Sequence, residues 1–290
     1  MQIGLAFPTT EIGNDPVVIR DFAQAVEGMG YRHLTIIDHV IQSPEAEAGD
    51  WRAYYTIDNP FHEPMVMLGF LAGATRTLEF ATAIMILPQR PTVLVAKQFA
   101  ELDVLCGGRL RAGFGVGWNA LEFEALGQDF ANRGPRMEEQ VEVLRALWSQ
   151  RTVDFDGQWH HLQDAGINPR PVQQPIPVWI GAFARVGIRR AGRIADGLFL
   201  NPRNAPDEQM AADIEICRQS AVAAGRDPHR FGLDATLHVG DRNPETLASE
   251  AQAWRAIGAT HLTIRTMYSG LADVDAHLRT LQRVRDALPD

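Results

Sequence analysis

Glycine recurs at every second position where a predicted strand ends. The sequence GFGVGWN covers residues 113–119, and its glycines are Gly113, Gly115 and Gly117. Small residues at this end of a strand let a flat molecule lie close to the backbone. The G-x-G-x-G spacing differs from the G-x-G-x-x-G of dinucleotide-binding folds. The run therefore favours clearance for a planar ring, or a simple strand-to-helix turn, over a nicotinamide site.

Two residues with side chains of functional interest follow the glycine run directly. Trp118 can line a pocket or pack in the core, and its type does not decide between them. Asn119 can bind a cofactor or cap the next helix, and asparagine favours the cap.

An acidic residue and a histidine stand side by side where another predicted strand, 33–37, ends. They are Asp38 and His39. An imidazole can donate, accept or shuttle a proton near neutral pH, whereas an ionised carboxylate only accepts hydrogen bonds. The pair can serve in proton transfer or act as an ordinary loop cap.

A turn of small residues precedes the predicted helix 184–192. It consists of Gly181, Ala182 and Phe183. Free backbone N–H groups and the helix dipole make such a turn a candidate anion site without a lysine. The other interpretation is a normal strand-to-helix connection.

Metal chemistry has little support in the sequence. His160 and His161 are adjacent, and neighbours in a strand point to opposite faces, so they cannot easily share a metal ion. Cys106 and Cys217 have no metal-ligand spacing and are expected in the core. We therefore predict no metal site.

Length and composition limit the possible classes. The 290 residues are 46% hydrophobic, and the net charge of −9 with a pI near 5.5 argues against nucleic-acid binding. The longest apolar run, 65–74, is half the length needed to cross a membrane. The two cysteines and the absence of a signal-peptide pattern predict a cytoplasmic protein.

Strand and helix patterns alternate along the whole chain. Predicted strands cover residues 2–7, 33–37, 80–87, 110–114, 176–180, 197–200, 231–239 and 261–264. Helical spacing of apolar residues follows each of them. Eight such pairs predict an α/β fold, a single (β/α)₈ TIM barrel that occupies residues 1–290 as one domain.

Two segments interrupt this alternation. Residues 40–62 form a long loop that contains Trp51, Tyr54 and Tyr55, and residues 152–162 resemble a small hairpin that turns at Asp156-Gly157. We expect both to be insertions over the carboxyl-end face of the barrel, where they would select the substrate.

Four of these segments together resemble the bacterial luciferase-like superfamily of flavin-dependent barrels. They are AVEGMGYRHLTIIDHV (25–40), the run 78–127, INPRPVQQPIPVWIGA (167–182) and RRAGRIADGLFLN (189–201). Within that superfamily the chain looks most like the branch that uses coenzyme F420, an 8-hydroxy-5-deazaflavin. The resemblance implies a homodimer and a small-molecule substrate.

The resemblance also implies roles for individual residues. Asp38 and His39 match the polar pair beside the deazaflavin ring, with His39 favoured for handling protons. Ala83 and Ile84 match a bulged non-prolyl cis peptide behind the ring. The segment that lines the ring and its polyol chain is matched by Gly117, Trp118 and Asn119. The phosphate-holding turn is matched by Gly181, Ala182 and Phe183.

One position departs from the pattern of the sugar-phosphate dehydrogenases in this family. Their catalytic glutamate follows the last glycine of the turn, and here that position is Trp118. No acidic partner for His39 is therefore available from that place, which argues against glucose 6-phosphate oxidation. An aromatic wall instead favours an apolar or planar substrate.

Three functions remain open on the sequence. The leading one is an F420-dependent oxidoreductase that moves a hydride between the coenzyme and an organic substrate; carbon in place of nitrogen at the reactive position disfavours oxygen activation. The second is an FMN-dependent two-component monooxygenase. The third is a flavin-binding protein without turnover, because fold alone does not prove function.

Overall fold

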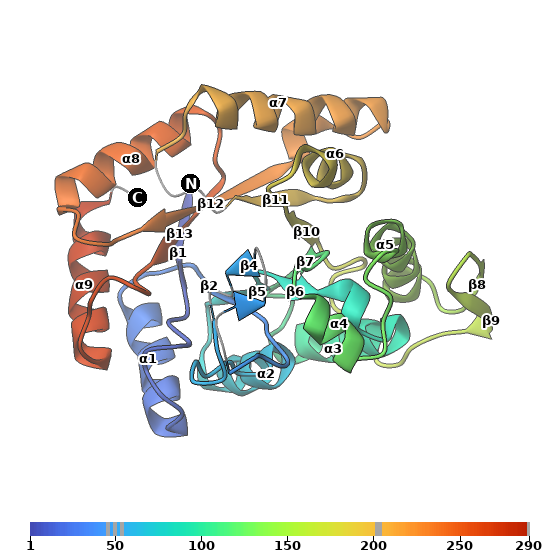
Figure 1. Ribbon diagram of the computed structural model, residues 1–290, viewed down its shortest axis with the longest axis horizontal. Helices are drawn as coiled ribbons and strands as arrows, with labels where there is room; N and C mark the ends of the chain where they lie inside the picture. Colours follow the sequence, from blue (N-terminus) through green and yellow to red (C-terminus); the bar gives the residue numbers. More distant parts are fainter. Residues whose placement is uncertain (45–46, 49–50, 53–54, 201–204, 289–290) are drawn as a thin grey trace.

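Eight parallel strands form a closed ring at the centre of the computed structural model, which describes residues 1–44, 47–48, 51–52, 55–200 and 205–288 (Figure 1). Around the ring they are β1 (Gln2–Ala6), β2 (His33–Ile36), β5 (Glu79–Thr82), β7 (Leu110–Gly115), β10 (Val178–Gly181), β11 (Gly197–Leu200), β12 (Gly232–His238) and β13 (His261–Arg265). The pairings of β13 with β1 and of β7 with β10 close it. The predicted (β/α)₈ TIM barrel is confirmed.

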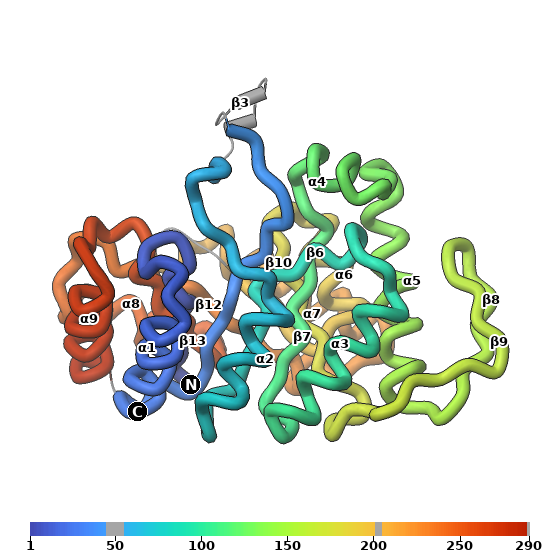
Figure 2. The backbone as a smooth tube through the Cα atoms, turned by 90° about the horizontal axis from the view of Figure 1, so that it is seen from below, coloured from blue at the N-terminus to red at the C-terminus, as the bar shows by residue number. Residues whose placement is uncertain are grey.

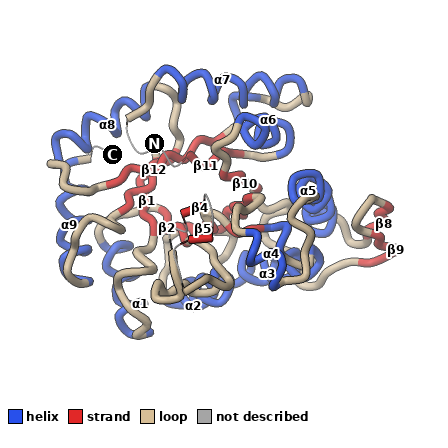
Figure 3. Tube along the Cα trace, in the orientation of Figure 1, coloured by secondary structure: helices blue, strands red, loops and turns tan. Residues whose placement is uncertain are grey.

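Helices surround the ring on its outer side (Figure 3). They are α1 (Pro16–Gly28), α2 (Pro64–Ala74), α3 (Thr92–Leu105), α5 (Arg133–Ser149), α6 (Arg185–Ile194), α7 (Glu208–Ala223), α8 (Pro244–Ala256) and α9 (Val274–Ala287), with the short 3₁₀ turns η1 (Leu87–Gln89) and η2 (Pro228–Arg230). Side-chain caps start several of them, such as Asp15 before Pro16. Within the described ranges, none of the helices has the length and apolarity needed to cross a membrane.

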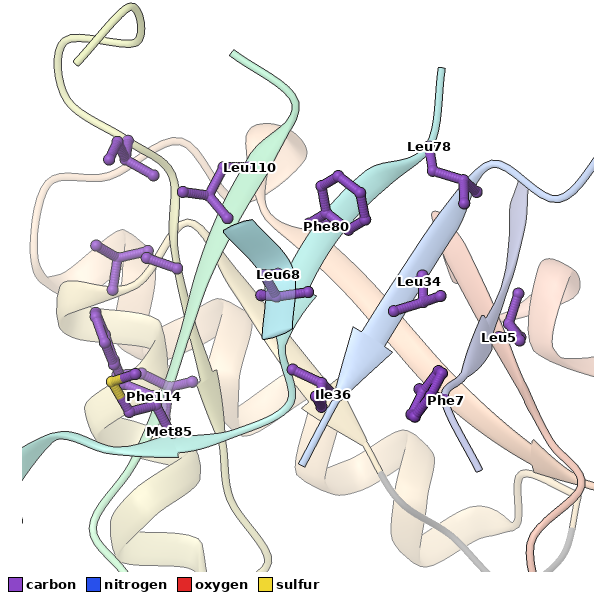
Figure 4. Close-up of a cluster of buried hydrophobic side chains, with 14 of the residues drawn as sticks. Leu5, Phe7, Leu34, Ile36, Leu68, Leu78, Phe80, Met85, Leu110 and Phe114 are labelled. Atoms are coloured by element: carbon purple, nitrogen blue, oxygen red, sulfur yellow. The ribbon is translucent and has the colours of Figure 1, made fainter. Parts of the chain in front are cut away.

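An apolar layer joins the strands to the helices. Leu34, Phe80 and Leu110 come from three neighbouring strands, and Leu68 of α2 covers them (Figure 4). All four are at most 1% exposed. Burial of this layer supplies the main stabilisation of the barrel and fixes the strand ends that form its mouth.

The third barrel strand is interrupted at its carboxyl end. β5 pairs with β7 up to Ala81, and the pairing resumes at Met85 in β6 (Met85–Ile86). Between these two points the strand has one residue more than β7, which is a β-bulge. The peptide between Ala83 and Ile84 is cis, as the resemblance implied. The Thr82 hydroxyl donates to the Gly113 carbonyl at 2.7 Å and accepts from the Gly113 N–H at 3.0 Å. One side chain thus replaces the missing backbone ladder.

The long loop 40–62 extends above the mouth of the barrel, as predicted (Figure 2). It contains the short paired strands β3 (Glu47–Ala48) and β4 (Trp51–Arg52). Tyr55 belongs to the described part of this loop, whereas Tyr54 and the side chain of Trp51 lie outside it.

The predicted hairpin exists, but its predicted place over the mouth is wrong. β8 (Val153–Asp156) and β9 (His161–Ala165) lie beside α5, at the flank of the barrel (Figures 1 and 2). Glu139 of α5 accepts the backbone N–H groups of three turn residues, Gln158, Trp159 and His160. These bonds draw the turn to the helix and away from the strand ends, which removes the basis for a role of the hairpin in substrate choice.

The lower interior of the barrel is polar. Arg111 is 4% exposed and forms ion pairs with Glu79 and Asp234. The Asp234 carboxylate accepts from Thr263 at 2.7 Å, and the Thr263 hydroxyl lies 2.9 Å from Nε2 of His33. This network places buried titratable groups far from the mouth.

Two histidines of this interior should make stability depend on pH. Burial and the Arg111 charge lower the pKa of His261 from 6.5 to about 3, and lower that of His33 well below its usual value. The unfolded chain therefore binds more protons than the folded protein between about pH 3 and 6.5. The free energy of unfolding should fall as pH decreases through that window, by up to about 1.4 kcal/mol per pH unit for each histidine.

His261→Phe should reduce this slope because it retains a ring and removes the titration. The measurement is urea denaturation from pH 4 to pH 8. His229→Gln, at an exposed position, is the control and should leave the slope as in the wild type. An unchanged slope in His261→Phe would contradict the assignment.

Candidate active site

His39 lies at the mouth of the barrel, just beyond the carboxyl end of β2. Its side chain is 10% exposed. Nδ1 lies 3.0 Å from Oε1 of Glu122. The ring also lies against three aromatic rings, with centroid distances of 5.2 Å to Tyr55, 4.9 Å to Phe61 and 5.8 Å to Trp118. The imidazole is thus held on one edge by a carboxylate and on its sides by aromatic rings.

Glu122 comes from α4 (Ala120–Ala125), a short helix that directly follows the glycine run. Asn119 caps this helix, since its side chain accepts the N–H of Leu121 at 3.1 Å. The cap orients the first turn, and Glu122 on that turn points into the mouth at 1% exposure. The helix-capping interpretation of Asn119 is therefore the one that the structure shows directly.

The aromatic wall continues from His39 across the mouth. The Tyr55 hydroxyl accepts from a terminal nitrogen of Arg265 at 3.3 Å, and its ring lies 6.4 Å from that of Tyr268. Arg265 ends β13 and Tyr268 follows it. The loop 40–62 is thus linked to both sides of the mouth through Tyr55, which the sequence placed in this loop without assigning it a partner.

Asp38, the neighbour of His39 in the sequence, is buried and 4% exposed. Its oxygens accept from a terminal nitrogen of Arg90 at 3.0 Å and from the Ile86 N–H at 3.2 Å. Burial raises the pKa of this carboxyl, and the Arg90 charge opposes that increase. Because Ile86 is in β6, Asp38 ties the end of β2 to the strand that resumes after the bulge.

The Ala83–Ile84 peptide lies beside the His39 segment. β2 and β5 are paired, and the Ala83 N–H donates to the Ile36 carbonyl at 2.7 Å. Ile84 is partly exposed, and a Cβ on Gly115 would lie 1.8 Å from its Cδ1, while one on Gly181 would lie 2.8 Å from its Cγ2. The Ile84 side chain therefore occupies space at the mouth that is open only because residues 115 and 181 are glycines.

Gly117 has a positive φ of 74°, which favours glycine, and the chain turns there toward α4. Trp118 follows, partly exposed and against His39. The structure thus brings together His39, Trp118 and the bulge, which come from three strand ends.

The turn Gly181, Ala182 and Phe183 leads into α6, and Phe183 is 78% exposed. The Ala184 N-cap makes no side-chain hydrogen bond, as is also true at the starts of α3 and α5, whereas side chains cap α1, α2, α7, α8 and α9. In the part of the chain that the structure describes, no side chain accepts the first N–H groups of α6, which suits a phosphate group.

The remaining candidates do not join this site. His160 interacts with Thr92 and Glu139, and His161 interacts with Asp156. Both cysteines are buried and free. Within the described ranges, no three histidine, cysteine or acidic side chains are grouped to hold a metal ion.

Sequence reasoning missed the carboxylate partner of His39. Trp118 indeed excludes an acid at that position, but Glu122, four residues later, supplies one. Gln89 and Arg90, which hold Glu122 and Asp38, were missed too. The available signal was an acidic residue in the first turn after the glycine run.

Comparisons with known proteins support a common fold and family. The family model described as luciferase-like monooxygenase matches residues 1–287. The chain belongs to the luciferase-like monooxygenase family. Its members named below are oxidoreductases with two different cofactors.

Two relatives of this luciferase-like protein carry functional names. An F420-dependent glucose-6-phosphate dehydrogenase of Kineococcus radiotolerans is 28% identical over 253 residues, 84% of this chain and 70% of the relative. An FMNH2-dependent dimethylsulfone monooxygenase of Pseudomonas putida is 31% identical over 204 residues, 69% of this chain and 55% of the relative.

The fold is shared with solved structures of the family. An F420-dependent secondary alcohol dehydrogenase in complex with an F420-acetone adduct superimposes with a TM-score of 0.82 at 19% identity, covering 100% of this chain and 99% of that one. At this identity the likeness establishes the barrel and not the reaction.

Gly113→Ala should damage the luciferase-like protein at the bulge. An added Cβ would lie 1.7 Å from the Thr82 carbonyl oxygen and 2.7 Å from a ring carbon of Phe199. Because a backbone atom cannot rotate away, we expect a loss of about 3 kcal/mol in unfolding free energy, measured by chemical denaturation. Gly28→Ala, with nothing within 4 Å of its Cβ, is the control and should lose no stability. Equal stability of the two variants would contradict this packing.

Proposed function

We propose that this protein is an F420-dependent oxidoreductase that moves a hydride between the deazaflavin and a small organic substrate. The observation that carries the proposal is the placement of the partly exposed Ala83–Ile84 peptide directly beside the His39 segment at the mouth. The sequence resemblance to the F420 branch and the name of the Kineococcus relative support it.

The residues present fit such a cofactor. Ala83, Ile84 and Gly117 would line the ring with Trp118 and Asn119 nearby, and the uncapped start of α6 after Gly181, Ala182 and Phe183 would hold the phosphate. Bound there, the deazaflavin would supply or accept the hydride. His39 would hold or move the accompanying proton, while Asp38 links the end of β2 to β6.

The aromatic wall supports an apolar or planar substrate. Tyr55, Phe61, Trp118 and Tyr268 present rings around or near His39. Such rings bind flat or apolar groups through their faces and edges. The ring faces and edges of this wall match a planar carbonyl or alkene compound better than a phosphosugar, so we rank sugar phosphates second as substrates.

A cofactor titration separates the proposal from its alternatives. Purified apoprotein should bind F420 at least tenfold more tightly than FMN, measured by fluorescence titration. The 31% identity to the FMNH2-dependent monooxygenase keeps FMN as the second candidate. Micromolar affinity for FMN with no binding of F420 would reverse the order.

His39→Ala tests whether the protein turns over substrate. With reduced F420 and a panel of planar ketones and enones, we expect kcat to fall by about 10²- to 10⁴-fold because general acid catalysis is lost. The F420 dissociation constant should change little. If every reductase activity stays at the wild-type level, the catalytic assignment fails and a binding protein without turnover becomes the better description.

We also propose a homodimer formed through α2 and α3. The sequence of α2, PMVMLGFLAGA, contains no charged residue, and its Val66 is 73% and Phe70 44% exposed. The neighbouring α3 exposes Leu94 and Leu105. A helix that is apolar on all sides is normally covered by protein.

Phe70→Glu should convert the dimer to a monomer because a charge cannot be buried unpaired in an apolar interface. Sedimentation velocity measures the change. Val222→Glu, at an exposed apolar position of α7, is the control and should remain dimeric. A monomeric wild type, or an unaffected Phe70→Glu variant, would contradict this interface.

A further inference from the structure

Both carboxylate oxygens of Glu122 lie against hydrogen-bond donors. Oε1 accepts from the Val40 N–H at 3.0 Å and lies 3.0 Å from Nδ1 of His39, and Oε2 accepts from the Gln89 side-chain amide at 3.1 Å. The side chains of Glu122 and Gln89 are buried. A carboxylate in this position has no contact that requires it to carry a proton.

The carboxyl group is ionised at neutral pH. Burial raises its pKa, but hydrogen bonds from His39, Gln89 and Val40 outweigh that effect and lower the pKa overall. An ionised carboxylate can only accept hydrogen bonds. The close contact with His39 therefore requires a proton on Nδ1, whatever the charge of the ring.

The other ring nitrogen is available to a ligand. Nε2 makes no hydrogen bond to any residue in the described ranges, and it is not among their buried polar atoms that lack a partner. The rings of Tyr55, Phe61 and Trp118 pack against the imidazole ring. Nε2 is thus the nitrogen that meets the contents of the mouth.

From these contacts we infer that Glu122 is a positioning residue that fixes His39 in the Nδ1–H tautomer and directs Nε2 at the substrate. The inference rests on the proposed function for its catalytic consequence. With a hydride passing from the reduced cofactor to a substrate carbon, the imidazolium form of His39, which is protonated on both nitrogens, would give its Nε2 proton to the neighbouring substrate atom. This leaves the neutral Nδ1–H ring, whose Nε2 takes one proton back from the solvent, and Glu122 stays charged throughout.

Spectroscopy of the cofactor-free protein tests the tautomer without any assay of activity. Protein labelled with ¹⁵N-histidine is examined by long-range ¹H–¹⁵N correlation at pH 8, and His39→Gln identifies the His39 signals. We expect Nδ1 protonated and Nε2 bare in the wild type. A wild-type His39 ring protonated on Nε2 would overturn the inference directly, even if the Glu122 variant failed to fold.

Glu122→Gln keeps the shape of the side chain and removes its charge. We expect loss of the single Nδ1–H form, with both tautomers visible, and a fall in kcat of about 10²-fold with KM and the F420 dissociation constant nearly unchanged. Unchanged tautomer and kcat would overturn the inference.

Glu124→Gln is the matched control, because Glu124 is exposed on the same short helix. It should keep the wild-type tautomer and kcat, and an equal loss in this variant would overturn the specific role of Glu122. The Nδ1–H tautomer in a protein that binds neither flavin would leave the positioning geometry standing and refute the proposed function instead.

Discussion

The mouth of this barrel depends on the close approach of the bulged segment after Thr82 to β7. Gly113 has no side chain because the Thr82 carbonyl occupies that space, and the Thr82 hydroxyl satisfies both backbone groups of Gly113. Buried backbone groups need hydrogen-bond partners. Because the Thr82 hydroxyl takes the place of the missing backbone partners, the bulge is compatible with a closed sheet. The strand can then leave the sheet plane at the place where Ile84 enters the mouth.

The bulge also connects the two carboxylates near His39. Asp38 holds Ile86, just beyond the bulge, and the Arg90 guanidinium donates to Asp38 and offsets its charge. Gln89 lies between Ile86 and Arg90 in the sequence, and its side-chain amide donates to Glu122. A short segment after β6 therefore positions both acids, and each acid fixes a different neighbour: Asp38 the backbone, and Glu122 the imidazole.

Electrostatic roles differ between the two ends of the barrel. At the lower end Arg111, Asp234 and His33 form a buried network, in which burial and the Arg111 charge lower the pKa of His33. At the mouth, His39 keeps a carboxylate partner and an accessible nitrogen. Histidine thus has a packing role in the lower interior and is available for proton transfer at the mouth. The difference comes from the neighbouring side chains at each place.

The sequence by itself determined the features that depend on local chemistry. Alternating strand and helix patterns predicted the barrel, and the type of Asn119 predicted a cap. The glycines at 113 and 115 indicated a close approach, but in the structure Thr82 and Ile84 of the chain itself fill that space. Only the tertiary structure decided which side chains meet. His39 and Glu122 are 83 residues apart, and Glu139 draws the 157–160 turn to α5 rather than over the mouth. Such pairings follow from closure of the ring, which brings strand ends together by geometry that no local spacing records.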